Sequence, residues 1–300
     1  MPVTVLGSIN LDIIHRVERL PRPGETVLSL EMQRFLGGKG ANQAVAAVRA
    51  GAATRLIAAI GADAAGEELL SSLRDEGVDV SAVSVAAGHP TGSAIICVDG
   101  DGENMIVVSL GANAQLKPVG GPGPGDVLLA QLETPIGALE AALTMPGMAW
   151  SRRILNAAPA VLDARRVFDL IDVLVVNETE LAVFAGLSTP PATAARCLDA
   201  AARLADESGV DVIVTRGAAG AVALAEGERF AVPGVMVEAR DATGAGDCFC
   251  GALAARLSAG AELKDAMGFA NMAAALSVAR PGASASMPTV DEIAAALDAG

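Results

Sequence analysis

Short apolar runs alternate with alanine-rich segments along most of this 300-residue chain, and this alternation restricts the fold more than any other feature. The apolar runs predict strands at 3–7, 55–60, 126–131, 153–156, 173–176 and 210–215. The alanine-rich segments predict helices at 41–50, 66–76, 135–143, 178–185, 193–208, 247–259, 263–279 and 290–299. Apolar strands separated by helices form a mostly parallel sheet that is covered on both faces. We therefore expect an α/β fold that binds its ligands beyond the carboxyl ends of the strands.

Two stretches interrupt the alternation. The pairs 13–19 with 26–35, and 91–98 with 104–110, alternate in polarity and are joined by turn-rich connectors without a helix. We expect these pairs to form a small antiparallel sheet beside the main body. The predicted division is an α/β domain of residues 1–12, 36–90 and 111–300, and a β-sheet domain of residues 13–35 and 91–110. The glycine- and proline-rich run 120–125 is too short for a domain linker.

Composition narrows the possible partners. Apolar residues make up 52% of the chain and aromatic residues only 2%, so a large core must be aliphatic. The formal net charge of −14, without a cluster of Lys or Arg, argues against a nucleic-acid partner. No signal-peptide pattern or membrane-spanning apolar run is found, so we expect a cytoplasmic protein without membrane association. Its cysteines lack metal-site spacing and are expected to be reduced: Cys97, Cys197, Cys248 and Cys250.

The segment 241–247 reads DATGAGD and leads directly into the predicted helix 247–259. Its glycines allow backbone N–H groups at the start of a helix to approach an anion such as a phosphate. Asp247 has two possible roles at this position. It could accept a proton from an attacking hydroxyl, or it could cap the helix. The segment by itself favours neither role.

A second glycine cluster, at 37–43, reads GGKGANQ and precedes the predicted helix 41–50. Lys39 and Asn42 would supply hydrogen-bond donors to a polar ligand. The cluster matches neither a Walker A loop nor a dinucleotide-binding fingerprint. Taken alone, it is more typical of a strand-to-helix turn with a solvated lysine.

Polar residues or glycines follow one predicted strand after another, and the carboxyl ends of these strands meet at one edge of the sheet. They are Asn10, Asp12, Glu133, Asn177, Glu180, Thr215 and Gly217. Acids and amides at this edge suit sugar hydroxyls, and Asn177 with Glu180 could hold a hydrated Mg²⁺. Helix caps and turns use the same residue types. The combination, more than any single residue, predicts a polar ligand site at this edge.

These motifs, in this order, resemble those of the ribokinase (PfkB-type) family of sugar and nucleoside kinases, and the resemblance covers essentially the whole chain. The diagnostic segments are 37–43 and 241–247, and the segments most similar to ribokinases are 7–12, 23–26, 111–114, 131–133 and 177–180, with Asn156 and Pro159. The resemblance implies a ribokinase-like fold, with a mostly parallel sheet flanked by helices and a small antiparallel β lid. It also implies ATP-dependent phosphorylation of a primary hydroxyl on a pentose, D-ribose to D-ribose 5-phosphate.

The resemblance assigns roles to individual residues. Asp247 would be the general base, and the anion hole would consist of Gly244, Ala245 and Gly246. The sugar would be bound by Asn10, Asp12, Gly38, Lys39, Asn42 and Glu133. The nucleotide would contact Asn177, Thr215, Gly217, Gly246 and Asn271, and Glu180 would support Mg²⁺ through water. The lid would clasp a second subunit in a homodimer.

The resemblance further implies an activating potassium ion, held by Asp241, Thr243, Val278, Pro281, Gly282 and Ser286. Two residues depart from the family pattern at this point. Ala242 stands where the family usually has a hydroxyl residue, and Pro281 interrupts the loop that would hold the ion. Backbone carbonyls could still coordinate a cation, so Ala242 does not exclude the ion.

Three alternative functions remain on the sequence evidence. The nearest is a nucleoside kinase or another sugar kinase of the same family. A catalytically silent sugar-sensing protein is the second, although sensing alone would not need Asp247 beside an intact glycine turn. A dinucleotide-dependent oxidoreductase is the third, and the missing fingerprint argues against it.

Overall fold

The computed structural model describes residues 1–117, 125–145 and 150–299. Within them, the larger sheet has nine strands in the order β13-β12-β11-β10-β9-β8-β1-β4-β5. Their bounds are β1 (Val3–Leu6), β4 (Thr54–Gly61), β5 (Val83–Ala86), β8 (Val127–Gln131), β9 (Arg152–Asn156), β10 (Val173–Asn177), β11 (Asp211–Thr215), β12 (Ala221–Ala225) and β13 (Glu228–Val232). All neighbouring pairs are parallel except β11–β12 and β12–β13. The six predicted strands are confirmed, and the sequence did not predict β5, β12 or β13.

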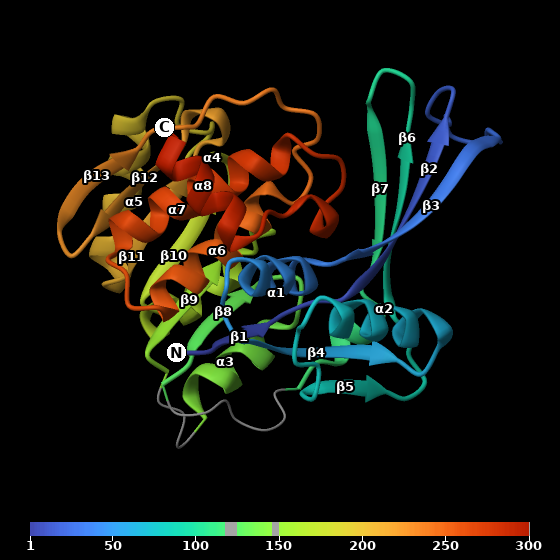
Figure 1. Ribbon diagram of the computed structural model, residues 1–300, viewed down its shortest axis with the longest axis horizontal. Helices are drawn as coiled ribbons and strands as arrows, with labels where there is room; N and C mark the ends of the chain where they lie inside the picture. Colours follow the sequence, from blue (N-terminus) through green and yellow to red (C-terminus); the bar gives the residue numbers. More distant parts are fainter. Residues whose placement is uncertain (118–124, 146–149, 300) are drawn as a thin grey trace.

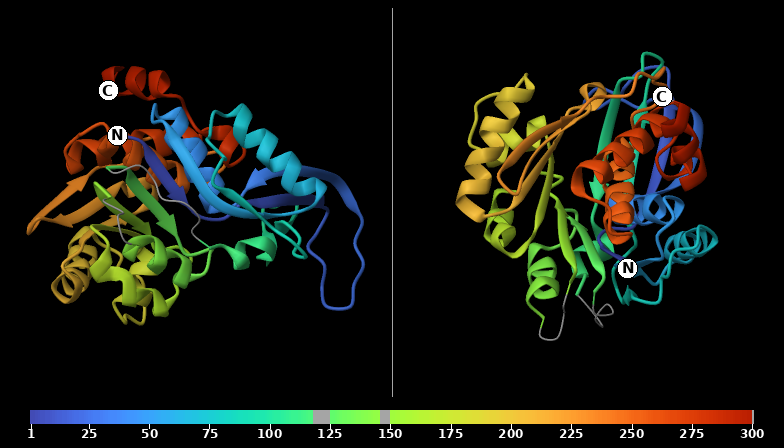
Figure 2. Two further views of the ribbon diagram at one scale, coloured as in Figure 1. Left: turned by 90° about the horizontal axis from the view of Figure 1, so that it is seen from below. Right: turned by 60° about the vertical axis from the view of Figure 1, so that its left-hand side comes forward.

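Helices cover both faces of this sheet, as Figure 2 shows in its left-hand view. One face carries α1 (Lys39–Arg49), α2 (Ala64–Asp75), α6 (Ala245–Ser258), α7 (Leu263–Val278) and α8 (Val290–Ala299). The other carries α3 (Ile136–Thr144), α4 (Glu178–Phe184), α5 (Ala194–Ser208) and the 3₁₀ helix η2 (Leu162–Leu170). Adjacent residues of a strand point to opposite faces, so Val5 belongs to one core and Leu6 to the other. The predicted covered sheet is confirmed.

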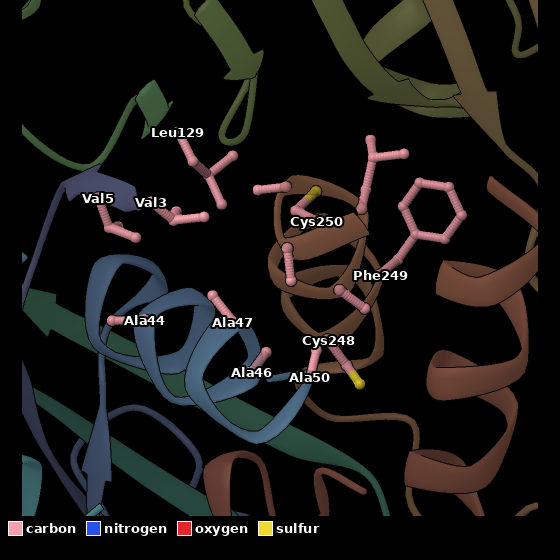
Figure 3. Packing of buried hydrophobic residues seen from close by; sticks show 14 of the residues in the cluster. Val3, Val5, Ala44, Ala46, Ala47, Ala50, Leu129, Cys248, Phe249 and Cys250 are labelled. Atoms are coloured by element: carbon pink, nitrogen blue, oxygen red, sulfur yellow. The ribbon is translucent and has the colours of Figure 1, made fainter. Parts of the chain in front are cut away.

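Helices α1 and α6 lie in backbone contact, which positions the site described below. A Cβ built on Gly251 of α6 would lie 2.5 Å from the Gln43 carbonyl oxygen and 2.5 Å from the Ala46 Cβ. Figure 3 shows the small side chains Ala46 and Ala47 of α1 facing α6. Only glycine fits at this contact without moving one of the helices. The close approach brings side chains near the start of α1 within hydrogen-bonding distance of α6.

The smaller sheet contains β3 (Ser29–Gly37), β2 (Asn10–Val17), β6 (Gly92–Val98) and β7 (Asn104–Ser109), in the order β3-β2-β6-β7. The pairs β2–β3 and β6–β7 are antiparallel, as predicted. Strands β2 and β6 join the two pairs by parallel pairing, which the sequence did not predict. Figure 1 shows these strands extending away from the helix-covered body.

The chain passes directly from β1 of the larger sheet to β2 of the smaller one, which begins at Asn10. Asn10 and Asp12 are therefore carried by the smaller sheet, at the point where the two sheets meet. The run 120–125 lies almost entirely outside the described residues. No helix in the described part of the chain is both long enough and apolar enough to cross a membrane.

Candidate active site

The glycine turn before α6 has the geometry expected of a backbone anion site. Gly244 is the N-cap residue in a left-handed conformation with φ of 75°, and α6 begins at Ala245. A side chain at Gly246 would meet nothing within 4 Å, so its backbone faces open space. The turn therefore presents the positive end of the helix dipole to a cavity.

Asp247, the third residue of α6, is 6% exposed. Its Oδ1 accepts a hydrogen bond from Gln43 Nε2 at 2.9 Å, and its Oδ2 accepts one from Asn42 Nδ2 at 3.1 Å. No side chain caps the N-terminus of α6. Because the carboxylate faces α1 instead of the first N–H groups of its own helix, the helix-capping interpretation of Asp247 is wrong.

Several ionisable groups surround this carboxylate. Burial raises the pKa of Asp247, while the Lys39 ammonium and the Gln43 and Asn42 amides oppose that rise. Asp247 in turn raises the pKa of Lys39, which stays a cation. Burial, with Glu133 and Asp247 nearby, raises the pKa of Asp12 to about 7. The cluster thus contains one carboxyl, Asp12, with a pKa of about 7 beside the buried carboxyl of Asp247.

The loop between β1 and β2 and the start of α1 are held by side chains from distant parts of the chain. Glu133 Oε2 accepts hydrogen bonds from Ser8 Oγ at 2.5 Å and from the Lys39 backbone N–H at 2.9 Å. Asn113 Nδ2 donates to the Ile9 carbonyl at 3.1 Å and to Asn10 Oδ1 at 2.8 Å. The Asn10 side chain therefore directs its carbonyl oxygen to Asn113 and keeps its NH₂ group for another acceptor.

Two adjacent glycines make room for these groups. A Cβ on Gly37 would lie 2.1 Å from Asp12 Oδ2. Gly38 has a φ of 88°, and a Cβ there would lie 2.8 Å from the Asn10 backbone nitrogen. The pair is needed for close approach of β2 and the start of α1, and the structure brings Asn10, Asp12 and Lys39 together at this point.

Two cavities meet at Thr215 and Gly246. The polar one, about 230 Å³, is lined by Lys39, Asn156, Asn177, Glu180 and Asp247, among others. The apolar one, about 310 Å³, is lined by Gly217, Val235, Val237, Phe249, Asn271 and Ala274, among others. A larger cavity of about 520 Å³ lies at the opposite, amino ends of the strands, against Val127 and Arg152, and contains none of the predicted site residues.

Asn177 and Glu180 form a capping box at the start of α4. Asn177 Oδ1 accepts from the Glu180 N–H at 2.8 Å, and Glu180 Oε2 accepts from the Asn177 N–H at 2.8 Å. The capping interpretation of these residues is confirmed. Both side chains also line the polar cavity, and burial raises the pKa of Glu180. Capping uses one carboxylate oxygen of Glu180 and leaves the other for a ligand.

The segment after α7 is tied to the glycine turn. The Asp241 carboxylate accepts from the Thr243 N–H at 2.9 Å and from the Gly282 N–H at 2.8 Å. The Val278 carbonyl accepts from the Arg240 and Asp241 N–H groups at 2.7 and 3.1 Å. Because a carbonyl oxygen has two lone pairs, Val278 has none left for a cation. Of the residues predicted to hold potassium, Val278 is the one that this geometry disfavours.

Buried amide residues of the site that were not predicted include Gln43, Asn113 and Asn156. Gln43 directly follows Asn42 in the glycine cluster, and the other two belong to short segments of family similarity. The signal available in the sequence was an amide residue inside such a motif. Their roles depend on partners more than 100 residues away, such as Asp247 for Gln43 and Ile9 for Asn113.

Comparison with known proteins gives a consistent result. The family model of the pfkB family carbohydrate kinases matches residues 2–290 of this chain. A ribokinase of Haemophilus influenzae is 36% identical over 296 residues, which cover 97% of this chain and 96% of that protein. The crystal structure of a Thermotoga maritima ribokinase matches with a TM-score of 0.89 and 34% identity, covering 99% of both chains. The structure of Arabidopsis thaliana ribokinase with ribose and ATP matches with a TM-score of 0.87 and 31% identity, covering 99% of this chain and 98% of that one.

Proposed function

Since this chain belongs to the pfkB family of carbohydrate kinases, we propose that it transfers the γ-phosphoryl group of ATP to the primary hydroxyl of D-ribose. The products are D-ribose 5-phosphate and ADP. The observation that carries this proposal is the position of Asp247. Its buried carboxylate lies at the start of α6, where a polar and an apolar cavity meet beside the acidic cluster of Asp12 and Glu133.

Asp247 acts as the general base in this proposal. Burial raises its pKa, which makes it a better proton acceptor than an exposed aspartate. It takes the proton of the sugar hydroxyl as the new oxygen–phosphorus bond forms. The backbone at Gly246 and the dipole of α6 stabilise negative charge on the transferred group. The Lys39 ammonium supplies a further positive charge.

The sugar lies between the two sheets in this proposal. Asn42 Oδ1 is buried and has no hydrogen-bond partner among the described residues, so it is an acceptor available to a ligand hydroxyl. Asn10 offers its NH₂ group, because Asn113 occupies its oxygen. Asp12 and Glu133 add carboxylate acceptors, with Gly38 and Lys39 beside them. Such a set of donors and acceptors suits vicinal hydroxyls.

The nucleotide occupies the joined cavities. The apolar cavity beside Asn271 accepts the adenine, and Asn177, Thr215 and Gly217 lie toward the phosphates. No group of three or more His, Cys, Asp or Glu that could hold a metal occurs among the described residues. Glu180, which uses one carboxylate oxygen in the cap of α4, would support Mg²⁺ through water with the other. When bound, the ion would neutralise charge on the phosphates.

A monovalent cation is proposed near the Asp241 carboxylate. Each Asp241 oxygen accepts one N–H, which leaves a lone pair on each for an ion. Thr243, Pro281, Gly282 and Ser286 are the further candidate ligands, while Ala242 offers only its backbone. The loop after α7 contacts the glycine turn before α6, because a Cβ built on Gly244 would lie 3.0 Å from the Ala283 Cβ.

Potassium is expected to raise kcat several-fold over sodium or tetramethylammonium at equal ionic strength, because the ion would fix the loop against the anion site. Asp241→Ala is expected to abolish this difference. The measurement is the initial rate with each chloride salt. Equal rates with all three cations would remove potassium from the proposal and leave the kinase activity unaffected.

The proposed substrate is tested by ADP release in a coupled assay with pentoses, hexoses and nucleosides at equal concentrations. D-ribose is expected to give the highest kcat/KM. Higher activity with a nucleoside would favour the nearest alternative, a nucleoside kinase. Ribose binding without ADP release from any acceptor would favour a sugar-sensing protein.

Gly37→Ala is expected to raise the KM for ribose about tenfold or more while changing stability little. The added methyl would displace the Asp12 carboxylate, which is the end of a side chain and can move without unfolding the strand. Steady-state kinetics and a thermal unfolding midpoint measure the two effects. Gly100→Ala, at an open hairpin position, is the matched control. A wild-type KM in the Gly37 variant would remove Asp12 from the sugar site.

We also propose that the smaller sheet is a lid and that it pairs with the lid of a second copy. Every residue of β7 is exposed, including Ile106 at 55% and Val107 at 63%. Exposed apolar residues also occur on β3 and β6, among them Leu30, Met32 and Ile95. Exposed apolar side chains on both faces of one small sheet favour an interface, and an unprotected sheet edge favours pairing.

Light scattering at micromolar concentration is expected to give twice the mass of one chain. Ile106 shares the sheet face of Asp12 through the strand registers, whereas Val107 points to the opposite face. Ile106→Asp and Val107→Asp therefore test the two faces separately, and at least one of them is expected to give monomers. A monomeric wild-type protein would rule out the proposed dimer.

A further inference from the structure

A row of buried amide side chains connects the ends of two strands with Asp247. Gln131, at the end of β8, donates from Nε2 to Gln43 Oε1 at 2.5 Å. Gln43 donates from Nε2 to Asp247 Oδ1 at 2.9 Å and to Asn156 Oδ1 at 3.1 Å. Gln43 is fully buried and Gln131 is 1% exposed. The row is therefore shielded from water. In such a low-dielectric interior, hydrogen bonds are stronger than in water, so their orientation matters more.

The orientation of the Gln43 amide is determined from both sides. Its carbonyl oxygen accepts from Gln131, and its NH₂ group faces two acceptors, Asp247 and Asn156. Asn156 in turn donates from Nδ2 to the Val175 carbonyl at 3.4 Å, which leaves its oxygen toward Gln43. A flipped Gln43 amide would place its oxygen against a carboxylate and against the Asn156 oxygen. Packing alone would not require this arrangement.

We propose that Gln43 is a positioning residue for phosphoryl transfer: it fixes the orientation of the Asp247 carboxylate and favours its ionised form. Gln131 and Asn156 act through Gln43 by holding its NH₂ group toward the carboxylate. The inference rests on the proposed function, in which Asp247 is the base. An ionised carboxylate only accepts hydrogen bonds. It is therefore the form of Asp247 that fits the amide donors directed at it.

Other charged and titratable groups act on Asp247 from each neighbouring element. Lys39 of α1 favours the carboxylate. Asp12 of β2, Glu133 after β8 and Glu180 of α4 oppose the negative charge. Cys248 and Cys250 lie on α6 itself, and burial raises the pKa of both thiols. Removing the Gln43 donor leaves all of these groups in place, so its effect can be measured separately.

Gln43→Met keeps the length of the side chain and removes the donor. The pKa on the acidic side of the kcat–pH profile is expected to rise by about one unit, because a carboxylate loses a hydrogen bond to its charged form. At pH values below that pKa, kcat is expected to fall about tenfold, with recovery toward the wild-type value as the pH rises. The KM values for ATP and ribose are expected to change little.

The control is Thr4→Val, which removes another buried hydrogen bond to a carboxylate. Thr4 Oγ1 donates to Asp126 Oδ2 at 2.9 Å near the amino ends of the strands, away from the site. A purely structural role for Gln43 predicts that both variants lose stability and that neither shifts the pH profile. The ADP-binding stoichiometry of each variant, measured by calorimetry, corrects kcat for the folded fraction.

An unshifted profile in Gln43→Met overturns the inference. Should that variant fail to fold, Gln131→Met must show an upward shift of the same sign, and an unshifted profile there overturns it as well. Wild-type kcat in Asp247→Asn would instead refute the proposed function. Loss of transfer in Asp247→Asn together with a wild-type profile in Gln43→Met would refute only this inference.

Discussion

Asp247→Asn is expected to lower kcat by about 10² to 10⁴, the usual range for loss of a general base, while ATP and ADP still bind. The amide is close in size to the carboxylate but cannot accept the hydroxyl proton. In the proposed complex the nucleotide lies in the two cavities, of which Asp247 is one of many lining residues, so calorimetry is expected to give near wild-type affinity. The rate is measured by coupled ADP release with saturating ribose.

Asp126→Asn is the control for the Asp247 variant. Asp126 is also a buried carboxylate, at 6% exposure, but it accepts from Thr4 near the amino ends of the strands and lines neither of the two cavities that meet at Gly246. Its variant is expected to keep wild-type kcat in the folded fraction. If Asp247→Asn behaved in the same way, Asp247 would not be the base.

Asp12→Ala is expected to lower kcat/KM for ribose by one to several powers of ten. An ionised carboxylate can accept two hydroxyl hydrogen bonds, and charge-assisted bonds contribute roughly 1.5–3 kcal/mol each. About 1.4 kcal/mol corresponds to a factor of ten. A sugar that lacks the 2-hydroxyl is expected to be a poorer substrate of the wild-type protein and to be less affected by the substitution.

The same residue predicts a pH dependence of sugar binding. Because the pKa of Asp12 is raised to about 7, its carboxyl is largely protonated below that pH and ionised above it. The protonated form accepts fewer hydrogen bonds. The KM for ribose is therefore expected to fall as the pH rises from about 6 to 8, and Asp12→Asn is expected to remove this dependence.

Equal use of ribose and 2-deoxyribose, or better use of adenosine, would refute the ribose assignment and leave the family unaffected.

The main sheet could be predicted because its central strands are apolar on both faces and are separated by helices. The predicted bounds 173–176 differ by one residue from β10 (Val173–Asn177). Strand β13 was missed because its residues are mostly exposed and lack a continuous apolar run. The parallel pairing of β2 and β6 joins segments about 80 residues apart, and no local pattern specifies it.

The sequence proposed many of the residues that the structure brings together at the candidate site, but neither their contacts nor the buried amides Gln43, Asn113 and Asn156. Capping and catalysis both remained open for Asp247, because both place an aspartate at the start of a helix. Its partner Gln43 is 204 residues away in the sequence, so only the folded chain shows that the side chain faces α1. For Asn177 and Glu180 the capping partners are three residues apart, and the local pattern was sufficient.

The contact between α1 and α6 has a consequence for changing the specificity of this protein by design. Gly251 holds the two helices at backbone distance, so Asp247, the proposed proton acceptor, and the amides that donate to it belong to one rigid unit. Asp12 is carried by β2 of the smaller sheet, outside that unit. Mutating the strands of the smaller sheet is therefore expected to alter the preference for the sugar while the Asp247 carboxylate keeps its alignment. A library aimed at new sugars should vary β2, β6 and β7 and leave the helix pair unchanged.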